Sequence, residues 1–191
     1  MEESYSGWGA TVRFQISPGA CPDGLDSALA ERGYRREGLM SLQGAPTGRV
    51  LEGAGACPVE VRVRDRPTEA WFRAWWAVHG IGDRRSEWEM LARVGRPSAF
   101  ACVVDGDEVV AVGRAVADAG WAGVFGMATL PRARGKGVAR GVLGALAGWA
   151  AGQGADRMYL QVERGNGPAL GLYGRAGFRE MCAYHYRVAV G

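Results

Sequence analysis

The sequence lacks the features of several protein classes. No apolar stretch approaches the roughly 18 residues of a membrane-spanning helix, and the acidic start MEESYSGWG has no signal-peptide core. The chain has 23 basic and 20 acidic residues, a net charge of only +3, and its arginines are dispersed instead of forming a basic tract. These absences predict a cytoplasmic protein that binds neither membranes nor nucleic acids.

Cysteine is also scarce. The four cysteines show no CxxC spacing and lie in or beside apolar segments; they are Cys21, Cys57, Cys102 and Cys182. This pattern is typical of buried free thiols rather than of disulfides or metal ligands. We therefore expect no metal.

The composition that remains is that of a globular protein. Apolar residues make up 48% of the 191-residue chain and charged residues 23%, which is enough for a sizeable core. The length accommodates one full domain, or one domain and a fragment.

Hydrophobic periodicity predicts the first elements after residue 57. Residues 59–64, VEVRVR, alternate as a strand does. Residues 66–80 carry a proline near the start of a predicted helix and a glycine at its end. A short second helix follows, for which SEWE at 86–89 predicts a capping box: Ser86 would be the cap and Glu89 would reach back to it.

A hairpin, a third strand and a long helix come next. Residues 98–116 are two apolar runs around Asp105-Gly106, a dipeptide suited to a tight turn. Residues 122–128 predict the third strand, and apolar residues at helical spacing predict a helix over 137–153 despite several glycines.

The chain ends with a strand (158–163), a helix (168–177) and a closing strand (181–190). The resulting order, β-α-α-β-β-β-α-β-α-β, predicts a mixed α/β fold of the α+β type. Its sheet would be largely antiparallel with one central crossover helix.

The segment RARGKGVARG, residues 132–141, lies where a strand ends and the long helix begins. Amides in the first turn of a helix have no intrahelical partner, and the helix dipole attracts an anion to them. Gly135 and Gly137 would let this backbone approach a phosphate closely. Three basic side chains add positive charge: Arg134, Lys136 and Arg140. The alternative is a flexible turn with solvated basic residues.

Two motifs at a characteristic spacing indicate a family. RGKGVA (134–139) fits the pattern Q/R-x-x-G-x-G/A, and there is no Walker loop. NGPALGLYGRAGF (166–178) resembles the signature N-x-x-A-x-x-x-Y-x-x-x-G-F. Over residues 58–190 the chain resembles the GNAT superfamily of acyl-CoA-dependent N-acyltransferases, which implies the GNAT fold with a mostly antiparallel sheet and flanking helices.

The resemblance implies roles for matching residues. The pyrophosphate of coenzyme A would lie on backbone amides of Arg134, Gly135, Lys136, Gly137, Val138, Ala139 and Arg140. The pantetheine arm would pair with the strand end formed by Met127, Ala128 and Thr129, and would contact Asn166 and Ala169. Tyr173 would face the acyl sulfur and protonate the departing thiolate; the alternative is a core tyrosine.

The proton acceptor has two candidates, because the family has no fixed base. Glu163, at the end of the strand 158–163, is the first candidate for a catalytic role beside Tyr173, although it is equally a solvated strand-end carboxylate. His185 has a suitable intrinsic pKa, but a lone histidine between Tyr184 and Tyr186 on a strand is more often structural.

Two features leave the acceptor open. The predicted helix 66–80 has two aromatic stripes, which either form core or floor an acceptor pocket: Trp71, Trp75 and Val78 on one, Phe72 and Trp76 on the other. Three nearby arginines either recognise an acid or face solvent: Arg84, Arg85 and Arg93.

The first part of the chain contains a diluted copy of its end. Residues 13–37 align with residues 159–180 as a strand with Gln, a turn with Pro, a helix and Gly-aromatic-Arg, after a two-residue insertion. In this copy Leu29 stands at the position of Tyr173, and Asn166 has no equivalent. The copy has no phosphate loop upstream, so we do not expect it to bind coenzyme A.

This copy resembles the last part of a degenerate N-terminal GNAT lobe, as in tandem members of the family. We expect a partial lobe and Gly/Ala/Pro-rich linker over 1–57, the linker near 44–57, and a catalytic domain over 58–191. Two strands and a helix cannot bury both faces of a sheet, so the half-lobe must dock on its own chain or on a second copy in a homodimer.

Together these features predict an N-acetyltransferase. It would use acetyl-CoA as co-substrate to acetylate a primary amine of a small molecule or peptide. The alternative is a non-catalytic acyl-CoA-binding regulatory module.

Overall fold

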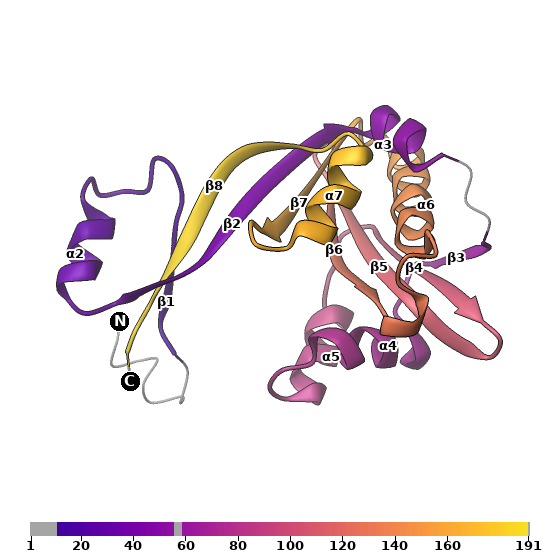
Figure 1. Cartoon of the computed structure of the whole chain (residues 1–191), viewed down its shortest axis with the longest axis horizontal. Helices are drawn as coiled ribbons and strands as arrows, with labels where there is room; N and C mark the ends of the chain where they lie inside the picture. The colour runs from indigo at the N-terminus through magenta and orange to yellow at the C-terminus, as the bar shows by residue number, and fades with distance from the viewer. Residues whose placement is uncertain (1–10, 56–58, 191) are drawn as a thin grey trace. The chain divides into compact units, whose positions relative to one another are not determined.

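The computed structural model describes residues 11–55 and 59–190, which form two compact units (Figure 1). The first unit comprises residues 11–43, Gln161–Leu170 and 180–190. The second comprises the described residues of Gly44–Leu160 together with Gly171–Arg179. Eight strands have the order β1-β8-β2-β7-β6-β5-β4-β3 and pair mostly antiparallel, which confirms the predicted fold class.

The elements follow the predicted order closely. In chain order, the first seven elements are β1 (Arg13–Ile16), α2 (Leu25–Glu31), β2 (Arg35–Pro46), α3 (Thr47–Ala54), β3 (Val61–Arg64), α4 (Glu69–His79) and α5 (Arg84–Ala92). They continue with β4 (Ser98–Asp105), β5 (Glu108–Asp118), β6 (Trp121–Thr129), the short 3-10 helix η1 (Pro131–Ala133) and α6 (Val138–Gly152). The last three are β7 (Arg157–Glu163), α7 (Gly167–Arg175) and β8 (Arg179–Val188).

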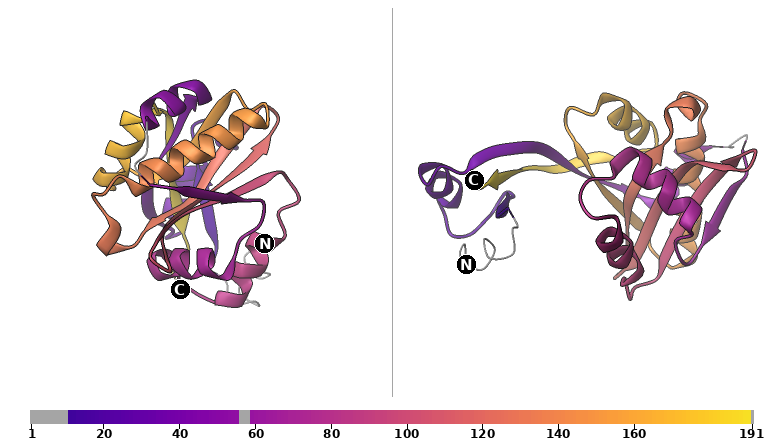
Figure 2. Two further views of the ribbon diagram at one scale, coloured as in Figure 1. Left: turned by 90° about the vertical axis from the view of Figure 1, so that its right-hand side faces the viewer. Right: turned by 90° about the horizontal axis from the view of Figure 1, so that it is seen from below.

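The second unit is a sheet covered by helices on both faces. Helices α6 and α3 lie on one face of its strands, and α4 and α5 lie on the other (Figures 1 and 2). Its β4–β5 hairpin turns at Gly106, whose φ is +61°. β6 and β7 are parallel, and α6 is the crossover helix between them. This architecture confirms the hairpin and the central crossover that were predicted.

Helix α4 places its aromatic side chains in the core. Trp71 and Phe72 are 2% and 1% exposed, and the Trp71 indole N–H donates to the Ala101 carbonyl at 3.0 Å. Trp75 and Trp76 are partly buried against the same cluster. Both stripes therefore pack in or against the core, and a role in an acceptor pocket stays a hypothesis.

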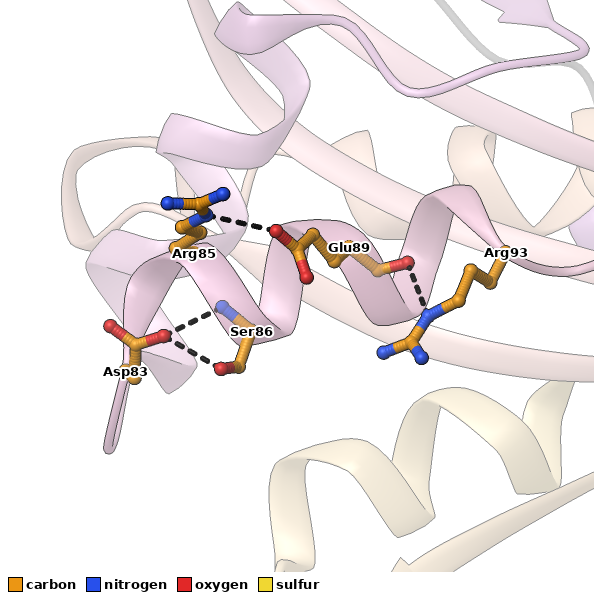
Figure 3. Close-up of polar contacts among 5 residues, drawn as sticks. All are labelled: Asp83, Arg85, Ser86, Glu89 and Arg93. Carbon is orange, nitrogen blue, oxygen red and sulfur yellow. Dashed lines mark hydrogen bonds and ion pairs between the residues drawn. The ribbon is translucent and has the colours of Figure 1, made fainter.

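The start of α5 corrects the predicted capping box. Asp83, not Ser86, is the N-cap, and its carboxylate accepts from the Ser86 amide at 2.8 Å and from the Ser86 hydroxyl at 2.7 Å (Figure 3). The Glu89 carboxylate accepts from Arg85 instead of reaching back to an amide. The pattern contains two capping residues three positions apart, and the one nearer the N-terminus starts the helix.

Residues 44–54 are not the linker that their composition predicted. They complete β2 and form the helix α3, whose Val50 and Ala54 are 0% and 3% exposed. α3 packs against α6, where a Cβ at Gly144 would come within 2.8 Å of the Ala54 Cβ. The small residues that suggested a linker are those that permit this close packing, and 56–58 lie outside the described residues.

The cysteines differ from one another in burial. Cys102 is buried in the α4 cluster and burial raises the pKa of its thiol. Cys182 is half-buried, whereas Cys21 is exposed, so the expectation of burial is wrong for Cys21. Cys57 lies outside the described residues.

In the first unit, β1 pairs antiparallel with β8, from Arg13–Val188 to Ile16–His185. Asp26, in the first turn of α2, accepts from His185 Nε2 at 2.8 Å and from Arg187 Nε at 2.6 Å. These bonds fix α2 to β8. Among the helices of residues 11–55 and 59–190, none has both the length and the apolar character needed to cross a membrane.

Candidate functional site

The glycine-rich loop between β6 and α6 is open. Gly135 and Gly137 have φ of +76° and +79°, in the left-handed region that favours glycine. A Cβ at Gly135 would meet nothing within 4 Å, and one at Gly137 only an Arg140 nitrogen at 3.9 Å. The space beside this backbone is therefore available to a ligand.

The N-terminus of α6 offers unpaired amides to that space. The first intrahelical bond runs from the Gly141 amide to the Gly137 carbonyl, so the amides of Val138, Ala139 and Arg140 have no intrahelical acceptor. No side chain caps the helix, and its first turn holds no acidic residue. This end of a fifteen-residue helix attracts an anion.

The basic side chains of the loop have no acidic partner among the described residues. Arg134, Lys136 and Arg140 are exposed, and none forms an ion pair with any residue that the structure describes. Arg134 Nε donates to the Thr129 carbonyl at 3.3 Å, which ties the loop to the end of β6. Together with the open amides, these cations fit a polyanion such as a pyrophosphate.

The sheet opens beside the second half of β6. β6 pairs with β7 from Trp121–Arg157 to Val124–Leu160, and beyond that point the described part of β6 pairs only with β5. The Leu130 amide donates to Val110 on β5, so by alternation the backbone groups of Met127 and Thr129 point to the open side. Ala128 points to β5, where it pairs with Val112.

His79, at the end of α4, reaches this open edge. Its Nε2 lies 3.0 Å from the Met127 carbonyl, which can only accept, so Nε2 carries the hydrogen and donates. The pairing of β6 with β5 shifts register between Phe125 and Ala128, which forms a bulge in β6. Trp75 lies beside this bulge, where a Cβ at Gly126 would approach its indole nitrogen to 3.2 Å. The sequence analysis missed His79, because only the packing of α4 brings it to β6.

Tyr173 lies on α7 within the second unit. It is 7% exposed, its ring contacts Phe178 edge to face at 5.9 Å between centroids, and burial raises its pKa to about 12. The phenol therefore keeps its proton at neutral pH. No described residue hydrogen-bonds to its hydroxyl, which can act as a donor to a ligand.

Asn166, Ala169 and Glu163 belong to the first unit. The Asn166 side-chain carbonyl accepts from the Ala169 amide at 3.2 Å and so caps α7, which leaves the amide NH₂ as its donor group. Glu163 is the exposed last residue of β7. Its backbone carbonyl accepts from the Asn166 amide at 2.9 Å.

The remaining candidates have structural partners. His185 is 8% exposed and bonded to Asp26. Tyr184 and Tyr186 contact each other edge to face at 5.6 Å, as expected for alternate residues of one strand. The three arginines considered for acid recognition bind partners on α4 and α5: Arg84 binds Glu69 of α4, Arg85 binds Glu89 of α5, and Arg93 binds the Glu89 carbonyl.

The family of the chain follows from comparison with known proteins. Residues 62–178 match the model of the acetyltransferase (GNAT) family. The chain belongs to the GNAT family. GNAT proteins transfer an acetyl group from acetyl-CoA to an acceptor, so this chain is an acetyltransferase.

Relatives cover nearly all of the chain. An uncharacterized N-acetyltransferase of Bacillus subtilis, YobR, is 28% identical over 96% of this chain and 75% of its own length. A GCN5-related N-acetyltransferase from Kribbella flavida has a TM-score of 0.68 at 19% identity, over 100% of this chain and 72% of that one. A tandem GNAT protein from the clavulanic acid biosynthesis pathway also has a TM-score of 0.68, at 13% identity, over 94% and 62% of the two chains.

Among the described residues, no group of three or more His, Cys, Asp or Glu side chains is placed to hold a metal ion.

Proposed function

We propose that acetyl-CoA binds at the N-terminus of α6, with its pyrophosphate on the amides of residues 135–140. The Arg134 amide donates to the Pro131 carbonyl at 3.2 Å, so Arg134 would contribute its side chain. The open space beside Gly135 and Gly137 and the unpaired cations of the loop support this assignment. The pantetheine arm would lie along Met127–Thr129, where β6 has an edge that β7 does not cover. Asn166 and Ala169 would contact the same arm, as the family motif implies.

The proposed reaction is attack of a neutral primary amine on the thioester carbonyl. The new C–N bond forms as the C–S bond breaks, the thiolate takes one proton, and the nitrogen loses one. Tyr173 would give its hydroxyl proton to the sulfur or hydrogen-bond to it, since burial keeps this phenol protonated. Transfer of a proton from the nitrogen, directly or through water, would regenerate the phenol.

Glu163 is the proposed base that removes a proton from the ammonium form of the amine before attack and releases it to solvent. Its carboxylate is exposed at the carboxyl end of β7, and it forms no ion pair with a described residue. Glu163→Gln should lower kcat with little change in acetyl-CoA affinity. His79→Gln is the informative companion, because it keeps a donor near the Met127 carbonyl and removes the imidazole; a larger loss of kcat in that variant would move the role to His79.

The experiment that tests the activity is thiol release from acetyl-CoA over a panel of primary amines and peptides. Release that depends on the amine, with the acetylated amine identified by mass spectrometry, would support the proposal. Calorimetric binding of acetyl-CoA without transfer to any amine would instead indicate a non-catalytic acyl-CoA-binding module.

We also propose that residues 1–57 are a partial, degenerate GNAT lobe attached to a catalytic domain over 58–191. Support comes from the similar ends of α2 and α7, where the amides of Tyr34 and Phe178 each donate to the carbonyl five positions back. The likeness to a tandem GNAT protein also supports it. The lobe would dock on its own chain or in a homodimer, in the cytoplasm. A chain beginning at residue 58 should be less soluble or less stable than the whole chain.

Because α3 packs on α6, that truncation also needs a control. A chain beginning at residue 44 keeps α3, so it separates the effect of removing residues 1–43 from the effect of removing α3. If the chain from 58 has the melting temperature, solubility and acetyl-CoA affinity of the whole protein, the lobe proposal is wrong.

A further inference from the structure

A buried arginine lies in the middle of the second unit without a counter-charge. Arg114, on β5, is only 8% exposed, and its Nε has no hydrogen-bond partner. No ion pair joins it to any residue in the described ranges, and burial lowers the pKa of its guanidinium. A buried charge without a partner is costly, and sites that tolerate it commonly receive the opposite charge from a ligand.

The walls around Arg114 are aromatic. Phe100 on β4 and Phe125 on β6 are its direct neighbours across the strands, so all three side chains share one face of the sheet. The guanidinium lies over the Phe100 ring, 5.3 Å from its centroid. Phe125 is 40% exposed and contacts Tyr159 edge to face at 5.9 Å, so the outer part of this face is accessible.

This face adjoins the open edge of β6. Phe125 directly precedes Gly126 and Met127, where pairing with β7 has ended. His79 and Trp75 contact the same two residues from α4. If acetyl-CoA lies along Met127–Thr129, a molecule on Phe125 and Tyr159 is beside its acyl end.

We propose that the acceptor amine carries a negatively charged group, a carboxylate or a phosphate, that binds the guanidinium of Arg114 between Phe100 and Phe125. This inference rests on the proposed acetyl transfer and adds the class of acceptor. The guanidinium supplies two or more donors to an anion, and the aromatic rings exclude water from that bond. An amine without the anionic group would leave the charge unpaired.

Kinetics on matched pairs of amines test the proposal. The pairs are L-phenylalanine with phenethylamine, and O-phosphoethanolamine with ethanolamine, which separate carboxylate from phosphate recognition. The wild-type enzyme should prefer one charged member, and Arg114→Met should raise its KM roughly tenfold to a hundredfold, the usual range for a lost charge-assisted bond. The acetyl-CoA KM should not change.

Arg157→Met is the matched control. Arg157 also lies over an aromatic ring of the same sheet, Trp121, at 5.6 Å, but it is exposed. This variant should leave the preference intact. Equal use of both members of each pair by the wild-type enzyme, or an unchanged KM in Arg114→Met, would overturn the inference.

A binding measurement keeps the result separate from the proposed activity. The Nε–H resonance of Arg114, assigned by its loss in Arg114→Met, should shift on titration with benzoate or phenyl phosphate and not with neutral benzamide. A shift without acetylation of any amine would sink the transfer reaction and leave the anion site standing. No shift with either anion would show that Arg114 serves only to pack against Phe100.

Discussion

Helices α2 and α7 end in the same way, although one belongs to the proposed degenerate lobe and the other to the acetyltransferase motif. Each is followed by a glycine with positive φ, +82° at Gly33 and +98° at Gly177. The next aromatic residue donates its amide five positions back, from Tyr34 to Leu29 and from Phe178 to Tyr173, both at 3.0 Å. The repeat seen in the sequence is therefore also a repeat of backbone geometry.

The side chains at equivalent positions differ. Leu29 is 3% exposed and apolar, whereas Tyr173 places a phenol at the same point of its helix. The two helices therefore share the backbone bonds of their endings but not the functional group at this position.

The starts of helices α2 and α6 make the same distinction in electrostatic terms. Both are capped by a glycine with φ of +79°, Gly24 and Gly137, and neither has a side-chain cap. α2 carries Asp26 in its first turn, so its own carboxylate complements the helix dipole. α6 has no acid there and a basic loop before it, so it is left to attract an external anion.

The largest expected effect comes from removing the hydroxyl of Tyr173, because the equivalent residue of α2 is Leu29. Tyr173→Phe should lower kcat about a hundredfold, the usual worth of general acid assistance, with little change in acetyl-CoA affinity. Tyr184→Phe is the control, because Tyr184 is also buried and its hydroxyl has no partner within the described residues. Single-turnover kinetics should show the loss in the first variant only; equal rates would remove Tyr173 from the mechanism.

The two glycine caps can be tested with the same substitution. Gly137→Val should weaken acetyl-CoA binding by more than tenfold, about 1.4 kcal/mol, because a branched side chain enters the space beside the anion site. Gly24→Val introduces the same backbone strain, since both residues have φ of +79°. Calorimetry should find unchanged affinity in folded Gly24→Val, and unchanged affinity in folded Gly137→Val would place the cofactor elsewhere.

The shared helix ending predicts a smaller pair of effects on stability. Gly33→Ala and Gly177→Ala each force a Cβ into the left-handed region, at a cost of about 1–2 kcal/mol. Gly177→Ala should cost more, because its Cβ would also lie 3.3 Å from the Arg49 Cβ, whereas Gly33 has open space. Denaturant unfolding measures both; the reverse order would contradict the packing of α3 against this corner.

The smallest effect concerns Asp26. Hydrogen bonds from Arg187, and then from His185, hold the pKa of this carboxyl well below its ordinary value. Its contribution is complete at neutral pH and is lost as pH falls below about 4, where the unfolded chain takes up a proton first. Since the side chain is 41% exposed, Asp26→Asn should cost only about 1 kcal/mol at pH 7, and less at acid pH. Denaturant unfolding of Asp26→Asn and of the wild type at neutral and acid pH measures this; an equal difference at both would contradict it.

Periodicity was sufficient to predict most elements of the second unit. Two apolar runs around Asp105-Gly106 gave the hairpin, and the proline and glycine that bound residues 66–80 gave α4. The N-cap of α4 is Thr68, whose hydroxyl accepts from the Trp71 amide at 3.1 Å. The glycines of RGKG were expected to leave space beside the backbone, and a Cβ at Gly135 would meet nothing within 4 Å. These signals come from residues close together in the sequence, so they can be interpreted without knowledge of the fold.

Features that depend on contacts between distant segments were not predicted. The Gly/Ala/Pro-rich residues 44–57 were interpreted as a linker, because nothing local shows that α6 offers Gly144 as a place for Ala54 to pack. His79 and Arg114 acquire their interest from the bulge in β6 and from the absence of a counter-charge. Neither the composition nor the residue spacing of the sequence indicates the bulge or the missing counter-charge.

The glycine content of α6 bears on what keeps this helix ordered. Four of its fifteen residues are glycine, each costing roughly 1 kcal/mol of helix propensity relative to alanine. Such a helix does not persist alone in water and becomes ordered only when α3 and the sheet enclose it. The end that attracts anions therefore depends on the packing of α3 and the sheet around the helix, so this property belongs to the folded unit and not to the segment 138–152 alone.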